Sequence, residues 1–284
     1  MPRPAGGLEG SAVLVTGGGT GIGAACARAL AADGAAVTIC GRRREVLEAS
    51  AEKIRAAAGA GGSVQLVVAD VVDEESVKAA VAAALEPTGR LDGCVANAGG
   101  GGGMGPYHVQ DTSEFLRVLH LNVLGTMLCV KHTVPHLVAA GGGSFVGMSS
   151  IAGHLTHPSF GAYCVAKAGI EEMMKNCADE FGARQVRFNS IRPGFIATEI
   201  MEGVPRDSAT YASYIENTPM QDVGQPDDVG ALARFLIGPE SRWITGTAIN
   251  VDGGHHLRRG PDFSPFIEPT YGAAVMQGEA PGQD

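Results

Sequence analysis

Three side chain types in the middle of the sequence have the spacing of an acid–base centre. Tyr163 and Lys167 form a Tyr-x-x-x-Lys pair, and an expected helix over 161–182 puts residues four apart on one face. A free phenol has a pKa near 10 and is a poor acid or base at neutral pH. A neighbouring ammonium favours the phenolate, so we expect it to bring the pKa of Tyr163 toward the working range. Ser149 and Ser150, at the end of an expected strand, supply hydroxyls that could hold a substrate oxygen and stabilise developing charge.

A glycine-rich turn near the N-terminus has the character of a phosphate-binding loop. Gly17 permits a sharp turn, Gly21 lets the backbone approach a pyrophosphate, and Gly23 lets helix and strand pack closely. A helix N-terminus offers free N–H groups and partial positive charge to phosphates. A turn without a ligand is the alternative, but the strand–loop–helix context favours a dinucleotide site. The turn reads Thr16-Gly17-Gly18-Gly19-Thr20-Gly21-Ile22-Gly23.

The glycine spacing resembles that of the short-chain dehydrogenase/reductase family, whose compact single-domain branch has Thr-Gly-x-x-x-Gly-Ile-Gly. In that family the catalytic serine lies thirteen residues before the tyrosine, which selects Ser150 over Ser149. The resemblance covers roughly residues 8–254 and implies that Ser150, Tyr163 and Lys167 are catalytic. It also implies that Asn122 positions a water that links Lys167 to bulk solvent.

The same resemblance implies further contacts with the cofactor. Asp70 and Val71 would bind the adenine, with a helix-start role for Asp70 as the alternative. Ala96-Asn97-Ala98-Gly99 resembles Asn-Asn-Ala-Gly, and Asn97 and Gly99 keep the cofactor-facing part although the first Asn is Ala here. Tyr163 and Lys167 would also contact the cofactor. In Pro193-Gly194-Phe195-Ile196-Ala197-Thr198, Ile196 would offer its backbone and Thr198 its hydroxyl to the nicotinamide carboxamide.

The residues after the second expected strand favour NADP(H), with NAD(H) possible. NAD-specific sites place an Asp or Glu here to accept from the ribose 2′-OH. This chain has Gly41-Arg42-Arg43-Arg44 instead. A guanidinium can pair with a 2′-phosphate that an acid would repel. We therefore expect Arg42 as the first contact and Arg43 as the second, a solvated basic helix start being the alternative.

Short β-branched runs alternate with longer helical ones, which predicts an α/β fold. The class expected is a Rossmann-type, doubly wound, parallel seven-stranded sheet in a single domain over 1–254. The expected strands are 11–16, 35–40, 64–69, 92–96, 143–149, 185–191 and 247–251. The expected helices are 21–33, 43–58, 74–85, 111–139, 161–182 and 226–237.

Composition excludes several other classes of protein. The net charge of −9 argues against a nucleic-acid partner. The six cysteines form no CxxC pair, so we expect buried thiols and no metal. We find no apolar run long enough to span a bilayer and no leader, and we expect a cytoplasmic protein without a membrane partner.

Two segments fall outside the alternating pattern. Residues 198–220 are expected to be an irregular substrate lid, and 255–284 a C-terminal tail with little periodicity. Phe263, Phe266 and Tyr271 of the tail could dock on a neighbouring subunit, or the tail could be disordered. The resemblance implies a homo-oligomer, a dimer or a homotetramer, paired through the helices at 111–139 and 161–182.

The predicted activity is hydride transfer between a nicotinamide and the carbonyl or secondary alcohol of a small-molecule substrate, with Tyr163 as general acid and base. The lid's Met, Val and Tyr residues suggest a partly apolar ligand. His154 could contact it or be a loop residue, and Gly99–Gly103 could leave room above the nicotinamide or be only flexible. A 3-oxoacyl thioester, a steroid, a sugar and a small ketone all remain open. Enoyl reduction, epimerisation and a non-catalytic dinucleotide-binding regulator are the alternatives.

Overall fold

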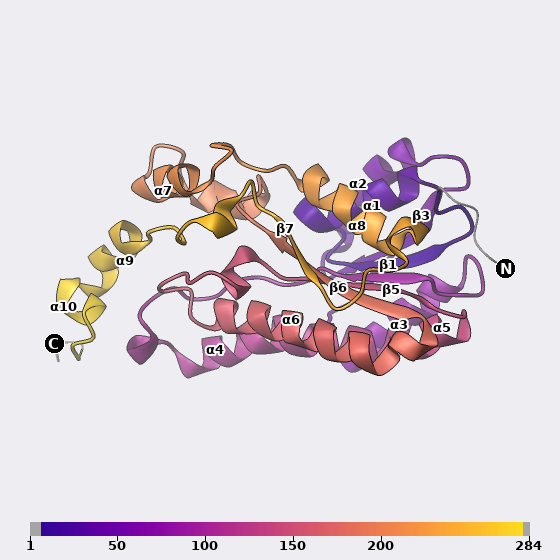
Figure 1. Ribbon diagram of the computed structural model, residues 1–284, viewed down its shortest axis with the longest axis horizontal. Helices are drawn as coiled ribbons and strands as arrows, with labels where there is room; N and C mark the ends of the chain where they lie inside the picture. Colours follow the sequence, from indigo (N-terminus) through magenta and orange to yellow (C-terminus); the bar gives the residue numbers. More distant parts are fainter. Residues whose placement is uncertain (1–6, 281–284) are drawn as a thin grey trace.

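A computed structural model describes residues 7–280, apart from the side chains of residues 200 and 202. Its centre is one seven-stranded sheet in the order β3-β2-β1-β4-β5-β6-β7, in which every neighbouring pair is parallel (Figure 1). The strand order reverses between β1 and β4, as in doubly wound folds, which confirms the predicted fold class. The strands are β1 (Ala12–Thr16), β2 (Ala36–Gly41), β3 (Ser63–Val68), β4 (Gly93–Ala96), β5 (Gly143–Met148), β6 (Val186–Pro193) and β7 (Ala248–Val251).

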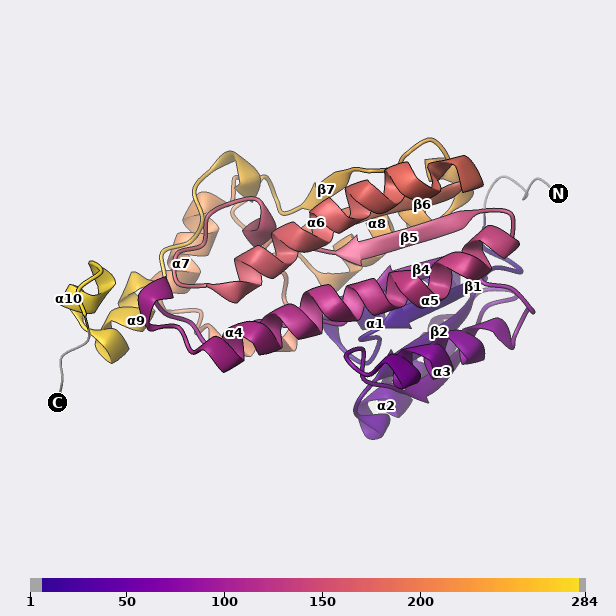
Figure 2. The same cartoon turned by 90° about the horizontal axis from the view of Figure 1, so that it is seen from below.

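Helices cover both faces of the sheet, because successive residues of a strand point to opposite sides. In β1, Val13 and Val15 pack into one core and Leu14 into the other. The first core lies under α1 (Gly21–Ala32), α2 (Arg44–Ala57) and α8 (Pro226–Ile237). The second lies under α3 (Glu74–Leu85), α5 (Gly125–Ala139) and α6 (Ala162–Phe181), and Figure 2 shows α5 and α6 side by side on that face.

The helix predicted over 111–139 is continuous but changes its winding. It consists of α4 (Thr112–Leu119), a π-helical segment (His120–Leu124) and α5. Such π segments occur frequently at functional sites, and this one contains Asn122. A hydrophobic period of 3.6 does not distinguish five π-helical residues from α-helix, so the sequence did not predict the change.

The expectation that no segment is long and apolar enough to span a membrane needs correction. The continuous helix Thr112–Ala139 is 28 residues long and passes by length and composition. Its α5 part buries Leu128, Cys129, Val134 and Leu137 against the sheet and α6. Packing in this core accounts for part of its composition, since 39% of its most apolar window is buried.

Helices occur in both segments that fall outside the βα alternation. In the segment 198–220, the predicted lid, α7 (Ala209–Asn217) follows Ser208, whose Oγ accepts from the Tyr211 N–H at 3.1 Å, so the expectation of an irregular segment is wrong there. In the tail, α9 (Ser264–Tyr271) and α10 (Ala273–Met276) follow the sheet. Pro265 lies in the first turn of α9, where proline is tolerated, and Pro269 lies inside the helix. Figures 1 and 2 place α7, α9 and α10 at one end of the molecule.

Candidate active site

A cavity of about 1090 Å³ lies along the carboxyl ends of the strands. This is where doubly wound sheets bind ligands, because loops diverge at the point where the strand order reverses. The predicted cofactor contacts from Gly17 to Thr198 line the cavity, as do Ser150, Tyr163 and Lys167. Asn122 does not line it, since its side chain is fully buried behind the wall. His154 is exposed and is also absent from the lining.

The glycine-rich turn has the shape of a phosphate cradle. Gly17 and Gly21 have φ values of +65° and +48°, which L side chains rarely adopt. A Cβ at Gly23 would lie 2.1 Å from the Gly17 carbonyl oxygen. The missing side chain therefore lets α1 pack against the glycine-rich turn, rather than against β1 as predicted. No side chain caps the start of α1, which leaves its first N–H groups for a ligand. The turn therefore fits a pyrophosphate.

The end of the cavity beside β2, where the sequence predicts the adenosine, is basic. Arg42 and Arg43 line it and are exposed, and no acidic side chain in the described part of the chain pairs with either of them. Asp70 also lines the cavity, and its Oδ1 accepts from the Val72 N–H at 3.2 Å. The alternative role of Asp70 as helix start is filled by Asp73, which caps α3 by accepting from the Ser76 N–H.

Tyr163 and Lys167 lie one turn apart near the start of α6. The Lys167 Nζ lies 5.5 Å from the centre of the Tyr163 ring and donates to the Met148 carbonyl oxygen at 2.8 Å. Burial lowers the pKa of Lys167 from 10.5 to about 8. Burial raises the pKa of Tyr163, and the interaction with Ser150 acts against this rise. The expected fall in the phenol pKa is thus not seen without cofactor, since desolvation outweighs the neighbouring groups.

The two serines after β5 face different surroundings. Ser149 is buried, and its Oγ donates to Glu171 Oε1 at 2.8 Å and is 3.0 Å from the Lys167 carbonyl oxygen. Ser150 Oγ accepts from the Ala152 N–H at 3.2 Å beside the cavity and interacts with Tyr163. Only Ser150 therefore has its hydroxyl beside the phenol, which agrees with the choice made from the family spacing.

Glu171 is a buried partner that the sequence analysis missed. Its carboxylate also accepts from Arg192 Nε at 2.6 Å and Nη2 at 2.5 Å, so it joins α6 to the ends of β5 and β6. A signal was present, because Glu171 follows Lys167 by four residues on the same helical face.

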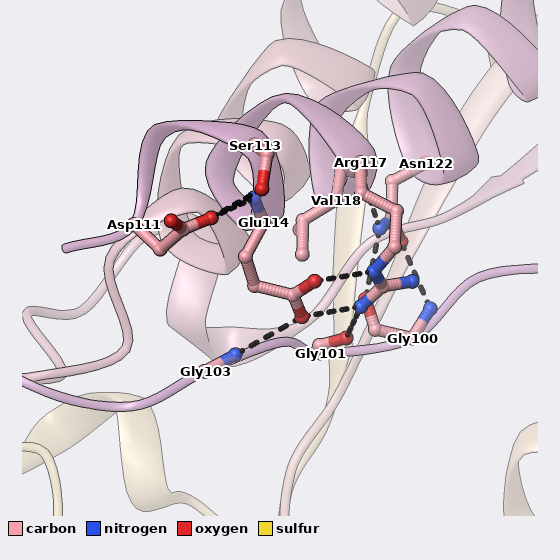
Figure 3. A network of polar contacts seen from close by, with 9 residues as sticks. All are labelled: Gly100, Gly101, Gly103, Asp111, Ser113, Glu114, Arg117, Val118 and Asn122. Atoms are coloured by element: carbon pink, nitrogen blue, oxygen red, sulfur yellow. Dashed lines mark hydrogen bonds and ion pairs between the residues drawn. The ribbon is translucent and has the colours of Figure 1, made fainter.

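Asn122 holds the glycine run in place (Figure 3). Its Nδ2 donates to the carbonyl oxygens of Gly100 and Val118, both at 2.9 Å, and its Oδ1 accepts from the Gly100 N–H at 3.3 Å. A Cβ at Gly99 would lie 2.5 Å from this Oδ1 and 3.3 Å from Lys167 Nζ. Asn122 therefore lies beside Lys167, and its side chain is hydrogen-bonded to the loop.

Two further side chains bind the same run. Glu114 accepts from the Gly103 N–H at 3.2 Å, and Arg117 donates to the Gly101 carbonyl oxygen at 3.1 Å while pairing with Glu114 (Figure 3). The run is therefore anchored to α4. The sequence analysis missed these contacts, since nothing in the spacing links 101 or 103 to 114 and 117.

The remaining predicted contacts close the cavity on the nicotinamide side. Asn97 Nδ2 donates to the Thr16 and Gly17 carbonyl oxygens at 3.1 and 3.3 Å, which ties the end of β4 to the phosphate loop. Gly194 has no room for a Cβ, which would lie 2.7 Å from Asp252 Cα. Thr198 lies over the phosphate loop, because a Cβ on Gly21 would be 3.1 Å from its Cγ2. No cluster of His, Cys, Asp and Glu that could hold a metal occurs within residues 7–280.

Comparisons with known proteins place the chain among oxidoreductases. Residues 17–256 match the model of a family described as "Enoyl-(Acyl carrier protein) reductase". The cis-4-hydroxycyclohexanecarboxylate dehydrogenase of Sinomonas cyclohexanicum is 36% identical over 242 residues, which are 85% of this chain and 95% of that protein. The 2,5-dichloro-2,5-cyclohexadiene-1,4-diol dehydrogenase of Sphingobium indicum is 34% identical, over 87% of this chain and 96% of that one.

A solved structure extends the likeness to almost the whole chain. A short-chain type dehydrogenase/reductase from Mycobacterium ulcerans superposes with a TM-score of 0.94 at 41% identity and covers 96% of this chain and 100% of its own. The chain therefore belongs to the short-chain dehydrogenase/reductase family and is an NAD(P)-dependent oxidoreductase that acts on an alcohol or a ketone.

Proposed function

We propose that Ser150, Tyr163 and Lys167 carry out the proton transfer of this oxidoreductase, with Asn122 in support. The observation that carries the proposal is that the end of β5 and one turn of α6 bring these three side chains to one cavity. The phosphate cradle lies along the same cavity. A substrate oxygen can therefore meet a proton donor beside the cofactor.

The roles of the side chains follow from their surroundings. The bound nicotinamide supplies the hydride chemistry. Burial keeps Tyr163 protonated at neutral pH, so it can give its proton to a carbonyl oxygen that Ser150 Oγ also holds. Lys167, with a pKa of about 8, can return a proton toward the phenol, and water near Asn122 would refill it.

The proposed substrate is a cyclic ketone or the matching secondary alcohol. The names of two relatives refer to dehydrogenases of six-membered rings. Enoyl reduction, named by the matching family model, and epimerisation remain alternatives. The pairing of Ser150 with Tyr163 favours carbonyl chemistry over both, because it places two hydroxyls around one oxygen. A non-catalytic regulator would not need this set.

We also propose a preference for NADP(H) and a homo-oligomeric state. The cofactor preference rests on the free guanidinium groups of Arg42 and Arg43 beside the end of β2, where the chain has Gly41 in place of an acid. The oligomer rests on exposed apolar side chains in the helical layer of α4, α5 and α6, namely Leu116, Met127 and Val165.

The Tyr163→Phe variant tests the proposed mechanism. Removing the phenol hydroxyl should lower kcat by about 100-fold or more while leaving cofactor affinity unchanged. Steady-state turnover of cyclohexanone with NADPH and NADH, and cofactor titration by fluorescence, measure the two quantities. Tyr211→Phe is the matched control, since Tyr211 lies on the lid but does not line the cavity. Wild-type turnover in Tyr163→Phe would refute the assignment.

A further inference from the structure

The tail places an aromatic side chain against the substrate end of the cavity. Phe263 is 6% exposed and lines the cavity. Its ring centre lies 4.7 Å from that of Phe160 and 6.0 Å from that of Tyr214. Phe160 in turn lies 6.0 Å from Tyr163 in an edge-on arrangement. One ring therefore separates the tail from the proposed proton donor.

Several polar contacts fix the tail on its own chain. The Asp262 N–H donates to Ser213 Oγ at 3.0 Å, and Tyr271 Oη donates to the Met104 carbonyl oxygen at 3.2 Å. A Cβ at Gly105 would lie 2.9 Å from the Tyr271 ring. The tail is thus bound both to the lid, through Ser213, and to the loop after the glycine run.

This tail lies beyond the part of the chain that the family model covers. The family match ends at residue 256, before the tail helices begin. The sheet and its two cores do not include Phe263 or Ile267, which form a separate cluster with Tyr214. Nothing in the sheet therefore requires the tail, whereas the cavity uses two of its side chains, Phe263 and Phe266.

The cavity near the tail carries no charge among the side chains that the structure describes. Its charged lining residues lie elsewhere: Arg42, Arg43 and Asp70 at the adenosine end, Glu199 beside the phosphate loop, and Lys167 in the proposed catalytic group. Around Phe263 the wall consists of Met104, Phe160, Phe195 and Tyr214, with Thr210 and His157 as uncharged polar groups. Burial lowers the pKa of His157, which keeps it neutral at pH 7. A charged ligand would lose its hydration here without a partner.

From these contacts we propose that residues 258–280 form a wall of the substrate site within the same chain and select an uncharged, ring-shaped ketone or alcohol. Phe263 forms the inner part of this wall, and Phe266, which is 57% exposed, borders its mouth. Flat aromatic faces such as Phe160, Phe195 and Phe263 favour a compact ring over an extended chain. The inference rests on the proposed function and specifies its substrate.

The test compares three ketones with the wild-type enzyme and with Phe263→Ala and Phe266→Ala. The ketones are 4-methylcyclohexanone, 4-oxocyclohexanecarboxylate, which differs from it by one charged group, and 2-butanone. The wild type should prefer the neutral ring ketone to the charged one by at least about tenfold in kcat/KM, because the wall around Phe263 offers no cation. In Phe263→Ala the KM for 4-methylcyclohexanone should rise by about tenfold, with a smaller change for 2-butanone and none in cofactor affinity.

Two controls separate a lost wall from a lost fold. Trp243→Ala removes an aromatic ring that is 89% exposed, precedes β7 and does not line the cavity, so its ring preference should match the wild type. Phe266→Ala alters an exposed side chain and should fold normally, with a smaller loss of ring preference. A variant ending at residue 257 should show the same loss as Phe263→Ala or a larger one.

The outcomes distinguish the role of the tail, the substrate class and the proposed function. Turnover by the wild type with unchanged ring preference in Phe263→Ala, Phe266→Ala and the truncated variant would overturn the role of the tail. Equal turnover of the charged and neutral rings would overturn the substrate class. No turnover of any ketone by the wild type, despite cofactor binding, would refute the proposed function itself.

Discussion

Lys167 carries its charge on a side chain that is almost fully buried. Its side chain is 4% exposed, and its Nζ has the Met148 carbonyl oxygen as hydrogen-bond acceptor. Burial of the ammonium favours the neutral amine, which is why the pKa falls to about 8. A low pKa suits a group that must pass protons near neutral pH, and it also makes the ammonium a cost to the stability of the cofactor-free protein.

Lys167→Met should therefore stabilise the protein without cofactor at pH 7. The unfolded lysine has a pKa of 10.5, so the penalty is fully present below about pH 8 and disappears as the pH rises to 10.5. A shift of this size corresponds to about 3 kcal/mol, from which the lost hydrogen bond to Met148 removes about 1 kcal/mol. Urea unfolding at pH 7 and at pH 10.5 measures the effect. The exposed Lys175→Met on the same helix is the control and should show no gain. An equal gain at both pH values would contradict the argument.

Arg42 should determine the choice of dinucleotide. Replacing it with Ala removes a bidentate partner for a 2′-phosphate, and we expect NADPH to bind about tenfold more weakly while NADH changes little. Fluorescence titration with both cofactors measures the ratio. Arg44→Ala is the matched control, because Arg44 pairs with Glu48 and does not line the cavity. A preference of the wild type for NADH would contradict the reasoning from Gly41 and Arg42.

At the residue scale, motif spacing predicted which residues line the cavity, but it did not predict their burial or their hydrogen bonds. Local patterns such as Tyr-x-x-x-Lys depend only on helix geometry, which the chain determines locally. The pKa of Tyr163 depends on how much of the fold covers it, and no sequence pattern gives that. The hydrogen bond from the Asn122 side chain to Gly100 likewise depends on the tertiary fold and has no sequence pattern.

At the scale of whole elements, α4 and the π segment hold the glycine run 99–103 in place. Three side chains separated from it by more than ten residues bind its backbone, so the run is more ordered than its composition suggests (Figure 3). Glycines allow the run to pass close to Lys167 and Asn122, and the α4 side chains replace the rigidity that glycine lacks.

Arg117→Ala should loosen this run. Arg117 contacts the Gly101 carbonyl oxygen and also orients Glu114 toward Gly103. We expect faster hydrogen exchange at Gly100 and Gly103 and a raised KM for substrate, whereas global stability should fall by less than about 1 kcal/mol because the pair is exposed. Lys175→Ala removes a pair of the same i,i+3 spacing that binds no loop, and it should leave exchange in the run unchanged. Unaltered exchange in Arg117→Ala would mean that the pair does not order the run.

The alternation of strands and helices was predictable, because burial on both faces of the sheet imposes it on the sequence. The expected helix 226–237 matches α8, and that over 74–85 matches α3. The helices of the lid and tail were missed because they bury only a few side chains each, such as Ile267 and Val275, and so show no regular apolar period.

At the scale of the whole molecule, the layer of α4, α5 and α6 is the surface best suited to pair with a second copy. Leu116, Met127 and Val165 expose apolar side chains there, at 47%, 37% and 46%. Met127→Glu should introduce an unpaired charge into such a contact and reduce the assembly to smaller units. Light scattering after gel filtration measures the mass. Val68→Glu, 43% exposed on the strand at the sheet edge, is the control and should keep the wild-type mass.

Met127→Glu also tests whether the wall of the substrate site comes from the same chain or from a neighbouring subunit. The described cavity takes its lining, Phe263 and Phe266 included, from a single chain. Smaller units formed by Met127→Glu should therefore keep the wild-type preference for a neutral ring ketone, even if the loss of neighbours lowers kcat by loosening α6. If a neighbouring subunit's tail supplied the wall instead, dissociation would remove it and the KM for the ring ketone would rise as in Phe263→Ala. An unchanged KM in a dissociated Met127→Glu enzyme would support a wall built by its own chain.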